Sequence, residues 1–159
     1  MSDTAVKLDS CKRKLSLIHP STLCILLTGS KDKKKEQIKE AIYYLAEAAH
    51  AKDNTDFVAH TYQALASIVG YMECEIEALN QMAIAMEYGA NKPEYGRNDW
   101  KKGIEWSRLI DAAQRHGLAI LNDEDIDADS GNRHVAHMLA SIHILLGNHA
   151  MSVGINDLY

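Results

Sequence analysis

The sequence lacks the residues that disulfide frameworks, membrane spans and nucleic-acid surfaces require. Its 159 residues include three widely spaced cysteines, an odd number that fits neither a disulfide framework nor a zinc knuckle and indicates a reducing compartment. No apolar run approaches the ~20 residues that span a bilayer, and the N-terminus lacks a signal-peptide pattern. The formal net charge of -5 provides no overall basic field. We therefore expect a cytoplasmic protein that binds no membrane and no nucleic acid.

Proline and phenylalanine are also scarce, and the abundant residues favour helices. There are two prolines and one phenylalanine, whereas alanine, leucine, isoleucine, methionine, glutamate and lysine are frequent. Hydrophobic residues make up 47% of the chain and charged residues 25%, which is ordinary for a globular protein with a buried core. No strand pattern or internal repeat is evident. We predict an all-α protein, in which residues 1–159 form one helical bundle of about four to five helices.

Apolar periodicity of 3.6 residues indicates where the helices lie. Residues 36–50 carry one apolar stripe, and residues 56–88 are long for a single helix, so we expect a kink or break at Gly70. Residues 104–121 and 134–146 are predicted to form the last two helices, each preceded by a polar loop. Beyond Gly70, helical spacing recurs for Ile76, Leu79, Ala83 and Met86.

The predicted helix W-S-R-L-I-D-A-A-Q-R-H gathers polar side chains on one face. Ser107, Asp111 and Arg115 are spaced i, i+4 and i+8, and Arg108 and His116 flank them. The two arginines are placed to pair with Asp111. Two interpretations remain open. The face is either a surface ladder of ion pairs, each contributing roughly a few tenths of a kcal/mol, or one wall of a site for an anion.

The last predicted helix begins with two histidines, His134 and His137, on the face opposite its apolar residues. Their H-x-x-H spacing alone is a weak metal signal, because the usual helical zinc spacing is i, i+4 and zinc needs further ligands. The two imidazoles need not be core residues, so we expect them to meet the face that carries Asp111 across the bundle. Two such faces would enclose a polar hollow for an anionic ligand.

The loop before this helix is rich in carboxylates, and Ser130 and Gly131 follow them. Five carboxylates fall within seven residues, and they are Asp123, Glu124, Asp125, Asp127 and Asp129. Hard oxygen ligands in a flexible loop suit Mg²⁺, which binds through one or two carboxylates and the phosphates of a substrate. A helix N-terminus also favours acidic residues without any metal, so both interpretations remain open.

Four stretches of the sequence together resemble one known family. They read K-L-D-S-C-K-R-K-L-S-L-I-H-P, E-Y-G-A-N-K-P-E-Y-G-R-N-D-W-K-K-G, S-R-L-I-D-A-A-Q-R-H and D-E-D-I-D-A-D-S-G-N-R-H-V-A-H, and the likeness covers residues 7–20 and about 79–146. The family comprises small phage and bacterial proteins labelled as the N-terminal domain of dATP/dGTP diphosphohydrolases, and it is similar to MazG-like all-α nucleotide pyrophosphohydrolases. Relative to its pattern, residues of about 28–78 look like an inserted helical pair, which we expect to serve oligomer or partner contacts.

The resemblance implies a phage enzyme, a metal-dependent purine (deoxy)nucleoside triphosphate pyrophosphohydrolase or diphosphohydrolase that adjusts nucleotide pools in the host cytoplasm. It implies Mg²⁺, or another divalent cation, as the cofactor, with Asp111 and Asp125 as its ligands. The implied catalytic residues are Asp111, His116, His134 and His137. The implied residues for the nucleotide and its phosphates are Lys7, Lys12, Trp100, Lys102, Ser107, Arg108, Arg115 and Ser130.

A second function from a different class remains open. MazG-like enzymes hold Mg²⁺ with paired E-x-x-E and E-x-x-D motifs, whereas this chain has only E-Q-I-K-E and E-C-E-I-E. The alternative is a non-catalytic phage protein that sequesters a nucleotide, or a nucleotide-derived signal, and acts against host defence. A site built from several helices of a small bundle is often completed across an interface. We therefore expect a homo-oligomer, a dimer or larger.

Overall fold

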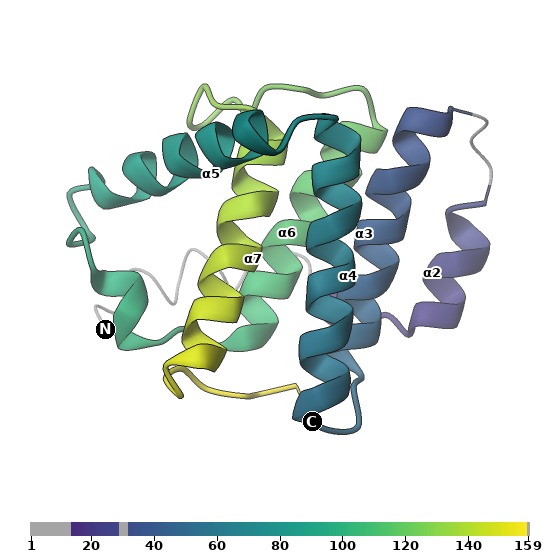
Figure 1. Ribbon diagram of the computed structural model, residues 1–159, viewed down its shortest axis with the longest axis horizontal. Coiled ribbons are helices and arrows are strands. Elements are labelled where there is room, and N and C mark those ends of the chain that lie inside the picture. Colours follow the sequence, from purple (N-terminus) through teal and green to yellow (C-terminus); the bar gives the residue numbers. More distant parts are fainter. Residues whose placement is uncertain (1–13, 29–31, 159) are drawn as a thin grey trace.

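The computed structural model describes residues 14–28 and 32–158, which fold into a helical bundle (Figure 1). Its α-helices are α2 (Pro20–Leu26), α3 (Lys33–Ala49), α4 (Asn54–Met72), α5 (Glu75–Ala90), α6 (Trp106–Leu121) and α7 (His134–Ala150). Two short 3-10 helices accompany them, η1 (Leu15–Leu17) and η2 (Asp99–Lys102). Within the described residues, β-structure is limited to isolated bridges, so the all-α prediction is confirmed.

We expected the long helical segment to break at Gly70. In the structure the break comes a few residues later. α4 continues through Gly70 to Met72, and Glu73 ends it in a left-handed conformation with a φ of 59°. Gly70 has a packing role instead, because an added Cβ there would lie 2.8 Å from the side-chain nitrogen of Gln37. The glycine therefore leaves room for the end of the Gln37 side chain of α3, and the residues after it make the turn.

The core lies where α3, α4, α6 and α7 pack together (Figure 1). α3 is central to it, since Ile38, Ile42 and Leu45 are buried and the helix contacts α2, α4 and α6. Gly117 of α6 permits one of these contacts, because a Cβ there would meet the Ile42 side chain at 2.9 Å. That residues 28–78 are an insertion stays a prediction, but α3 contributes to the core and not only to an outer surface.

α5 is set apart from the other helices and crosses α7 (Figure 1). Its Ala85 packs against Ala136 and Ala140 of α7, whereas Ile76 is 72% exposed and Leu79 is 64% exposed. Part of the apolar stripe of α5 therefore lies on an outer face. Over residues 14–28 and 32–158, no helix, α5 included, combines the length and apolar content that crossing a bilayer requires.

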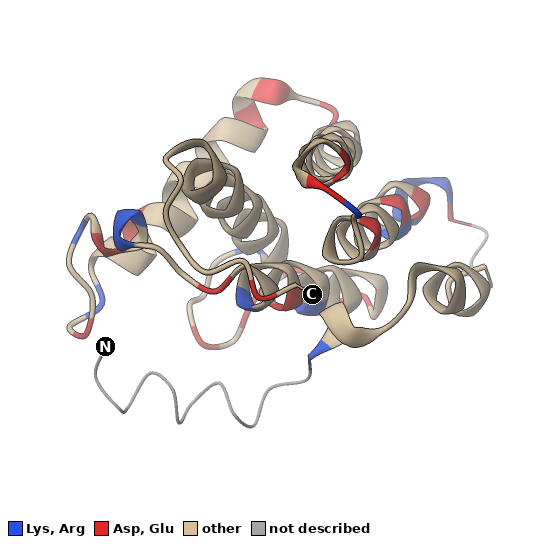
Figure 2. Ribbon diagram, turned by 90° about the horizontal axis from the view of Figure 1, so that it is seen from below, with Lys and Arg blue, Asp and Glu red and all other residues tan. Residues whose placement is uncertain are grey.

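Charged side chains of both signs are interspersed around the molecule (Figure 2). Two ion pairs involve the loop between α6 and α7. Lys35 of α3 contacts Asp123 at 2.5 Å, and Arg133, at the start of α7, contacts Asp125 at 3.0 Å. The pairs therefore tie the acidic loop to α3 on one side and to α7 on the other.

Candidate functional site

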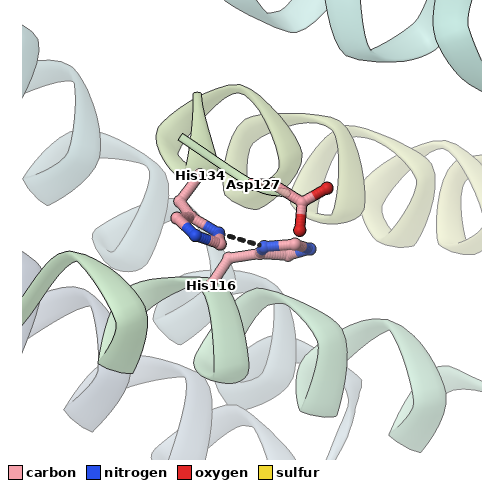
Figure 3. A group of neighbouring side chains, drawn as sticks. All are labelled: His116, Asp127 and His134. Carbon is pink, nitrogen blue, oxygen red and sulfur yellow. Dashed lines mark hydrogen bonds between the residues drawn. The ribbon is translucent and has the colours of Figure 1, made fainter. Parts of the chain in front are cut away.

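Three side chains from three different elements converge beneath the α6–α7 loop. His116 comes from α6, His134 is the first residue of α7, and Asp127 belongs to the loop that joins the two helices. Figure 3 shows these side chains pointing toward one another, and the Nδ1 atoms of the two histidines lie 2.8 Å apart. His134 is 7% exposed, and the other two side chains are half-buried. We call His116, Asp127 and His134 the histidine–aspartate cluster.

A tight turn in the loop fixes the direction of the Asp127 carboxylate. Its Oδ2 accepts hydrogen bonds from the Ser130 N–H at 3.0 Å and from the Ser130 hydroxyl at 2.6 Å. The Gly131 N–H donates to the Asp127 carbonyl at 2.8 Å, and Gly131 has a φ of 71°, a conformation that favours glycine. The segment D-A-D-S-G therefore forms a turn that aims a carboxylate at two histidines.

His137 lies beside the cluster, one helical turn further along α7. Its Nε2 is 2.7 Å from the Ser130 hydroxyl and 3.7 Å from Asp127 Oδ2. When the single hydroxyl hydrogen goes to Asp127, it is the His137 Nε2–H that donates to Ser130. The His137 ring stacks on the His116 ring, with centroids 4.7 Å apart. The Tyr88 ring of α5 makes a T-shaped contact with the His137 ring, with centroids 5.9 Å apart. Residues of α5, α6, α7 and the loop therefore surround one imidazole.

Burial keeps the His116 and His137 rings neutral near pH 7. Burial, together with the neighbouring His137 and His134, lowers the pKa of His116 to about 3. Burial also lowers the pKa of His137, although the Asp127 carboxylate opposes this shift. Partial burial raises the pKa of Asp127, but hydrogen bonds from Ser130 outweigh it, so the net pKa is lowered. At neutral pH the site therefore presents unprotonated His116 and His137 rings and an ionised Asp127 carboxylate.

This donor set can hold a metal ion. One ligand atom from each of His116, Asp127 and His134 lies within 4.8 Å of the others. Metal binding requires neutral imidazoles and ionised carboxylates, and His116 and Asp127 are in these forms near pH 7. Three protein ligands also leave a coordination position for water or substrate, as in catalytic metal sites. Among the residues that the structure describes, this is the one such group of at least three His, Cys, Asp or Glu side chains.

The structure brings four of the predicted site residues together around Asp127. They are His116, Ser130, His134 and His137. Asp127 itself was missed as a site residue, because the sequence offered it only as one of five neighbouring carboxylates. A signal for it was present. A serine three positions after an aspartate favours a turn in which the two side chains bond, and Ser130 stands there.

Asp111, which we predicted to be both catalytic and metal-binding, faces a different part of the molecule. Its Oδ1 accepts a hydrogen bond from the Ser16 N–H of η1 at 2.6 Å, and the residue is only 4% exposed. A separation of five residues places Asp111 about 140° around the α6 axis from His116. The polar face of α6 is therefore divided, with Asp111 toward η1 and His116 toward α7.

Asp125, the second predicted metal ligand, lies beside the cluster. Its carboxylate pairs with Arg133 Nε at 3.0 and 3.2 Å, and its carbonyl accepts the His134 N–H at 2.8 Å. The pair with Arg133 also lines a pocket of about 220 Å³, which includes Lys35 and Tyr71. Asp125 thus helps to fix the start of α7 and so the position of His134.

Two of the predicted phosphate-binding residues are arginines of α6. Arg115 adjoins His116 in the sequence, and its charge contributes to the low pKa of that histidine. Arg108 Nε lies 3.9 Å from Glu105 Oε2. Two further predicted residues, Lys7 and Lys12, lie outside the described residues.

The other predicted nucleotide-binding residues lie toward the opposite end of α7. The Trp100 ring packs against His143 with centroids 5.3 Å apart, about 14 Å along the α7 axis from the cluster. Lys102 forms an ion pair within η2 at 2.6 Å. Ser107 donates to Asp157 from its N–H at 2.9 Å and from its hydroxyl at 2.5 Å. These three residues therefore surround the C-terminal half of α7, away from the histidines at its start.

Fold and site together define an all-α protein with a histidine–aspartate cluster able to hold a metal ion. The chain belongs to the family described as "dATP/dGTP diphosphohydrolase, N-terminal", which matches residues 64–157, so the resemblance expected from the sequence is confirmed. It is also similar to the dATP/dGTP diphosphohydrolase of Salmonella phage PMBT28, with 32% identity over 59 residues. That match covers 37% of this chain and only 20% of the relative. No solved structure matches the chain.

Proposed function

We propose that the protein hydrolyses purine deoxynucleoside triphosphates at the histidine–aspartate cluster, with the help of a divalent cation. The family description and the name of the phage relative support the substrate class. The observation that carries the proposal is the convergence of His116, Asp127 and His134, whose ligand atoms lie within 4.8 Å of one another. The chain spans a fifth of that relative, so the local chemistry of the cluster is the main support for activity in this chain.

The residues around the cluster suit distinct roles in such a reaction. A cation held by the cluster would neutralise phosphate charge and polarise the reacting phosphoryl group. His137 is neutral near pH 7 because burial lowers its pKa, and Ser130 fixes its ring, so it can accept a proton from water. Arg115 adjoins His116, and its guanidinium can bind a pair of phosphate oxygens. The nucleotide would therefore lie with its phosphates against α6 and the start of α7.

The test is to incubate the purified protein with dATP or dGTP and Mg²⁺ or Mn²⁺, and to separate the products by chromatography. We expect deoxynucleoside monophosphate and pyrophosphate. The rate should fall about 100-fold or more in His137→Asn, since acid–base groups contribute roughly 10²–10⁴-fold. The matched control is His143→Gln, a histidine of the same helix that packs on Trp100, which keeps the wild-type rate. The incubation is repeated with Zn²⁺, and intact nucleotides with all three ions would reject hydrolysis.

The alternative function is sequestration, in which the protein binds a nucleotide or a nucleotide-derived signal without cleaving it and so acts against host defence. One observation favours it. The matched domain is described as N-terminal, and the match spans a fifth of the phage relative, which leaves room in that relative for chemistry elsewhere. Recovery of the intact nucleotide after the complex is denatured would support sequestration, whereas recovery of the monophosphate would support hydrolysis.

Both functions predict that a nucleotide raises the melting temperature of the protein, because a ligand that binds only the folded state stabilises it. The shift should grow with the concentration of dATP or dGTP. If neither nucleotide changes the melting temperature, hydrolysis and sequestration of dATP and dGTP are rejected. A structural helical adaptor would then be favoured.

We also propose that the protein forms a homo-oligomer, a dimer or larger. The exposed Ile76 and Leu79 of α5 support this, because an outward apolar stripe favours association. Light scattering should give at least twice the mass of one chain, and Leu79→Lys should lower that mass. A wild-type mass equal to one chain would reject the proposal.

A further inference from the structure

We propose that the histidine–aspartate cluster binds a first-row transition ion of the Zn²⁺ type, in preference to Mg²⁺. The ligands are one ring nitrogen each from His116 and His134 and the carboxylate of Asp127. This inference deepens the proposed function by naming its ion, and it rests on the same cluster. The ion and its ligands both differ from those that the resemblance implied, which were Mg²⁺ on Asp111 and Asp125.

The chemistry of the donors decides between the two kinds of ion. Two of the three ligand groups are imidazoles, and imidazole nitrogen suits Zn²⁺, Fe²⁺, Co²⁺ and Ni²⁺. Mg²⁺ prefers carboxylate, carbonyl and water oxygens in near-ideal octahedral geometry, and the cluster offers it one carboxylate. Because two of the three donors are nitrogen atoms, we expect the cluster to bind first-row transition ions such as Zn²⁺ more tightly than Mg²⁺.

The geometry of the two histidines is close to what such an ion requires. Their Nδ1 atoms lie 2.8 Å apart, as in a hydrogen bond between the rings. Two nitrogens on one tetrahedral Zn²⁺, each at about 2.0–2.1 Å from it, would lie roughly 3.3 Å apart. Rotation of the His116 or His134 side chain, with the proton of the donating ring moved from Nδ1 to Nε2, would convert the hydrogen-bonded pair into a pair of ligands.

The surroundings of the carboxylate resemble the supporting shell of a metal site. Asp127 Oδ2 accepts two hydrogen bonds from Ser130, so the orientation of the carboxylate is fixed before any ion binds. Partners of this kind orient metal ligands and commonly change affinity 10–100-fold. The backbone of His134 is fixed in the same way, by its N–H bond to the Asp125 carbonyl at 2.8 Å. Two of the three ligands are thus held in place by neighbours.

The experiment is a calorimetric titration of the full chain, first dialysed against a chelator, with Zn²⁺ and separately with Mg²⁺. Absorption spectroscopy with Co²⁺, whose visible bands report a tetrahedral site, accompanies it. We expect one ion of Zn²⁺ or Co²⁺ per chain and Mg²⁺ binding at least roughly 100-fold weaker. His134→Ala should weaken Zn²⁺ binding at least roughly 10-fold and abolish the Co²⁺ bands. His143→Gln, on the same helix, should change neither.

Asp127→Asn keeps the size of the side chain and provides a second variant where His134→Ala does not fold. Its far-ultraviolet circular dichroism should match the wild type, and its Zn²⁺ affinity should fall. The inference is overturned if the wild-type protein binds Mg²⁺ as tightly as Zn²⁺. It is also overturned if both folded variants keep wild-type Zn²⁺ affinity.

The result for metal binding can be told apart from the result for nucleotide hydrolysis. Tight Zn²⁺ binding without any loss of dATP or dGTP would support the metal site and reject hydrolysis. Hydrolysis that survives in His134→Ala would support a nucleotide hydrolase and reject the cluster as its reaction site, whereas the Zn²⁺ titration alone decides the metal site.

Discussion

The Nδ1 atoms of His116 and His134 lie 2.8 Å apart, although a complete loop separates the two histidines in the sequence. Only one of the two nitrogens can donate in this contact, so the other presents its lone pair. Burial keeps the His116 ring unprotonated, and Asp127 points into the same space (Figure 3). Once the proton of the donating ring moves to its Nε2, both Nδ1 atoms offer lone pairs next to a carboxylate. A metal ion would stabilise this arrangement, and the first predictions concern it.

Ser130→Ala should weaken Zn²⁺ binding by about 10–100-fold without unfolding the protein. The change removes the hydroxyl that donates to Asp127 at 2.6 Å and contacts His137 at 2.7 Å, so both side chains gain freedom. Calorimetry measures the affinity. The control is Ser141→Ala, the same substitution at a serine within α7, and it should leave the Zn²⁺ affinity unaltered. Equal affinities for the two variants would show that the serine does not support the cluster.

Asp111→Ala should cost about 1–3 kcal/mol of stability and leave Zn²⁺ binding unchanged. The carboxylate accepts the buried Ser16 N–H at 2.6 Å, and its removal leaves that donor without this partner. Urea unfolding measures the stability, and calorimetry measures the affinity. A large loss of Zn²⁺ affinity with little loss of stability would return Asp111 to the role of a metal ligand.

The metal-free protein should lose stability as the pH falls below about 6.5, where unfolded histidines take up protons. Burial, with His137 and His134, holds the folded pKa of His116 at about 3, so the unfolded chain binds more protons between these values. The lowered pKa of Asp127 acts in the same direction. Melting temperatures at about pH 7 and about pH 4.5 measure the effect. His116→Gln should reduce the difference between the two temperatures, and an unchanged difference would contradict this cause.

Gly103→Ala should destabilise the protein by about 1–3 kcal/mol. Gly103 has a φ of 97°, and a Cβ there would lie 2.3 Å from the backbone nitrogen of Gly154, which no side-chain movement can relieve. Gly89→Ala in α5 is the matched control. A Cβ at Gly89 meets nothing within 4 Å, so helix propensity should raise the stability by about 0.5–1 kcal/mol. Urea unfolding of both variants checks the opposite signs.

Local sequence patterns predicted most of the helices, but not all of their limits. α3, α6 and α7 lie where apolar periodicity placed them. α6 begins at Trp106 and not at Ile104, because Ile104 is held in an extended contact. Its N–H donates to Asn148, and its carbonyl accepts from Ile155. Such contacts join residues far apart in the sequence, so periodicity does not contain them.

The site was harder to predict than the fold. The spacing of His134 and His137 pointed to the end of α7 where the histidine–aspartate cluster lies, and the resemblance added His116 and Ser130. Composition alone did not distinguish Asp127 from its four acidic neighbours, and the one local signal for it was the serine three positions later. Which carboxylate turns inward depends on the turn closed by Ser130 and on how closely α6 and α7 pack, which are properties of the folded chain.

The most direct test of the metal centre is an anomalous difference map from a crystal grown with Zn²⁺, recorded at the zinc absorption edge. The account predicts one strong peak among the side chains of His116, Asp127 and His134, at about 2.0–2.2 Å from each ligand atom. A peak beside Asp111 or Asp125 instead, or no peak at the cluster, would contradict it.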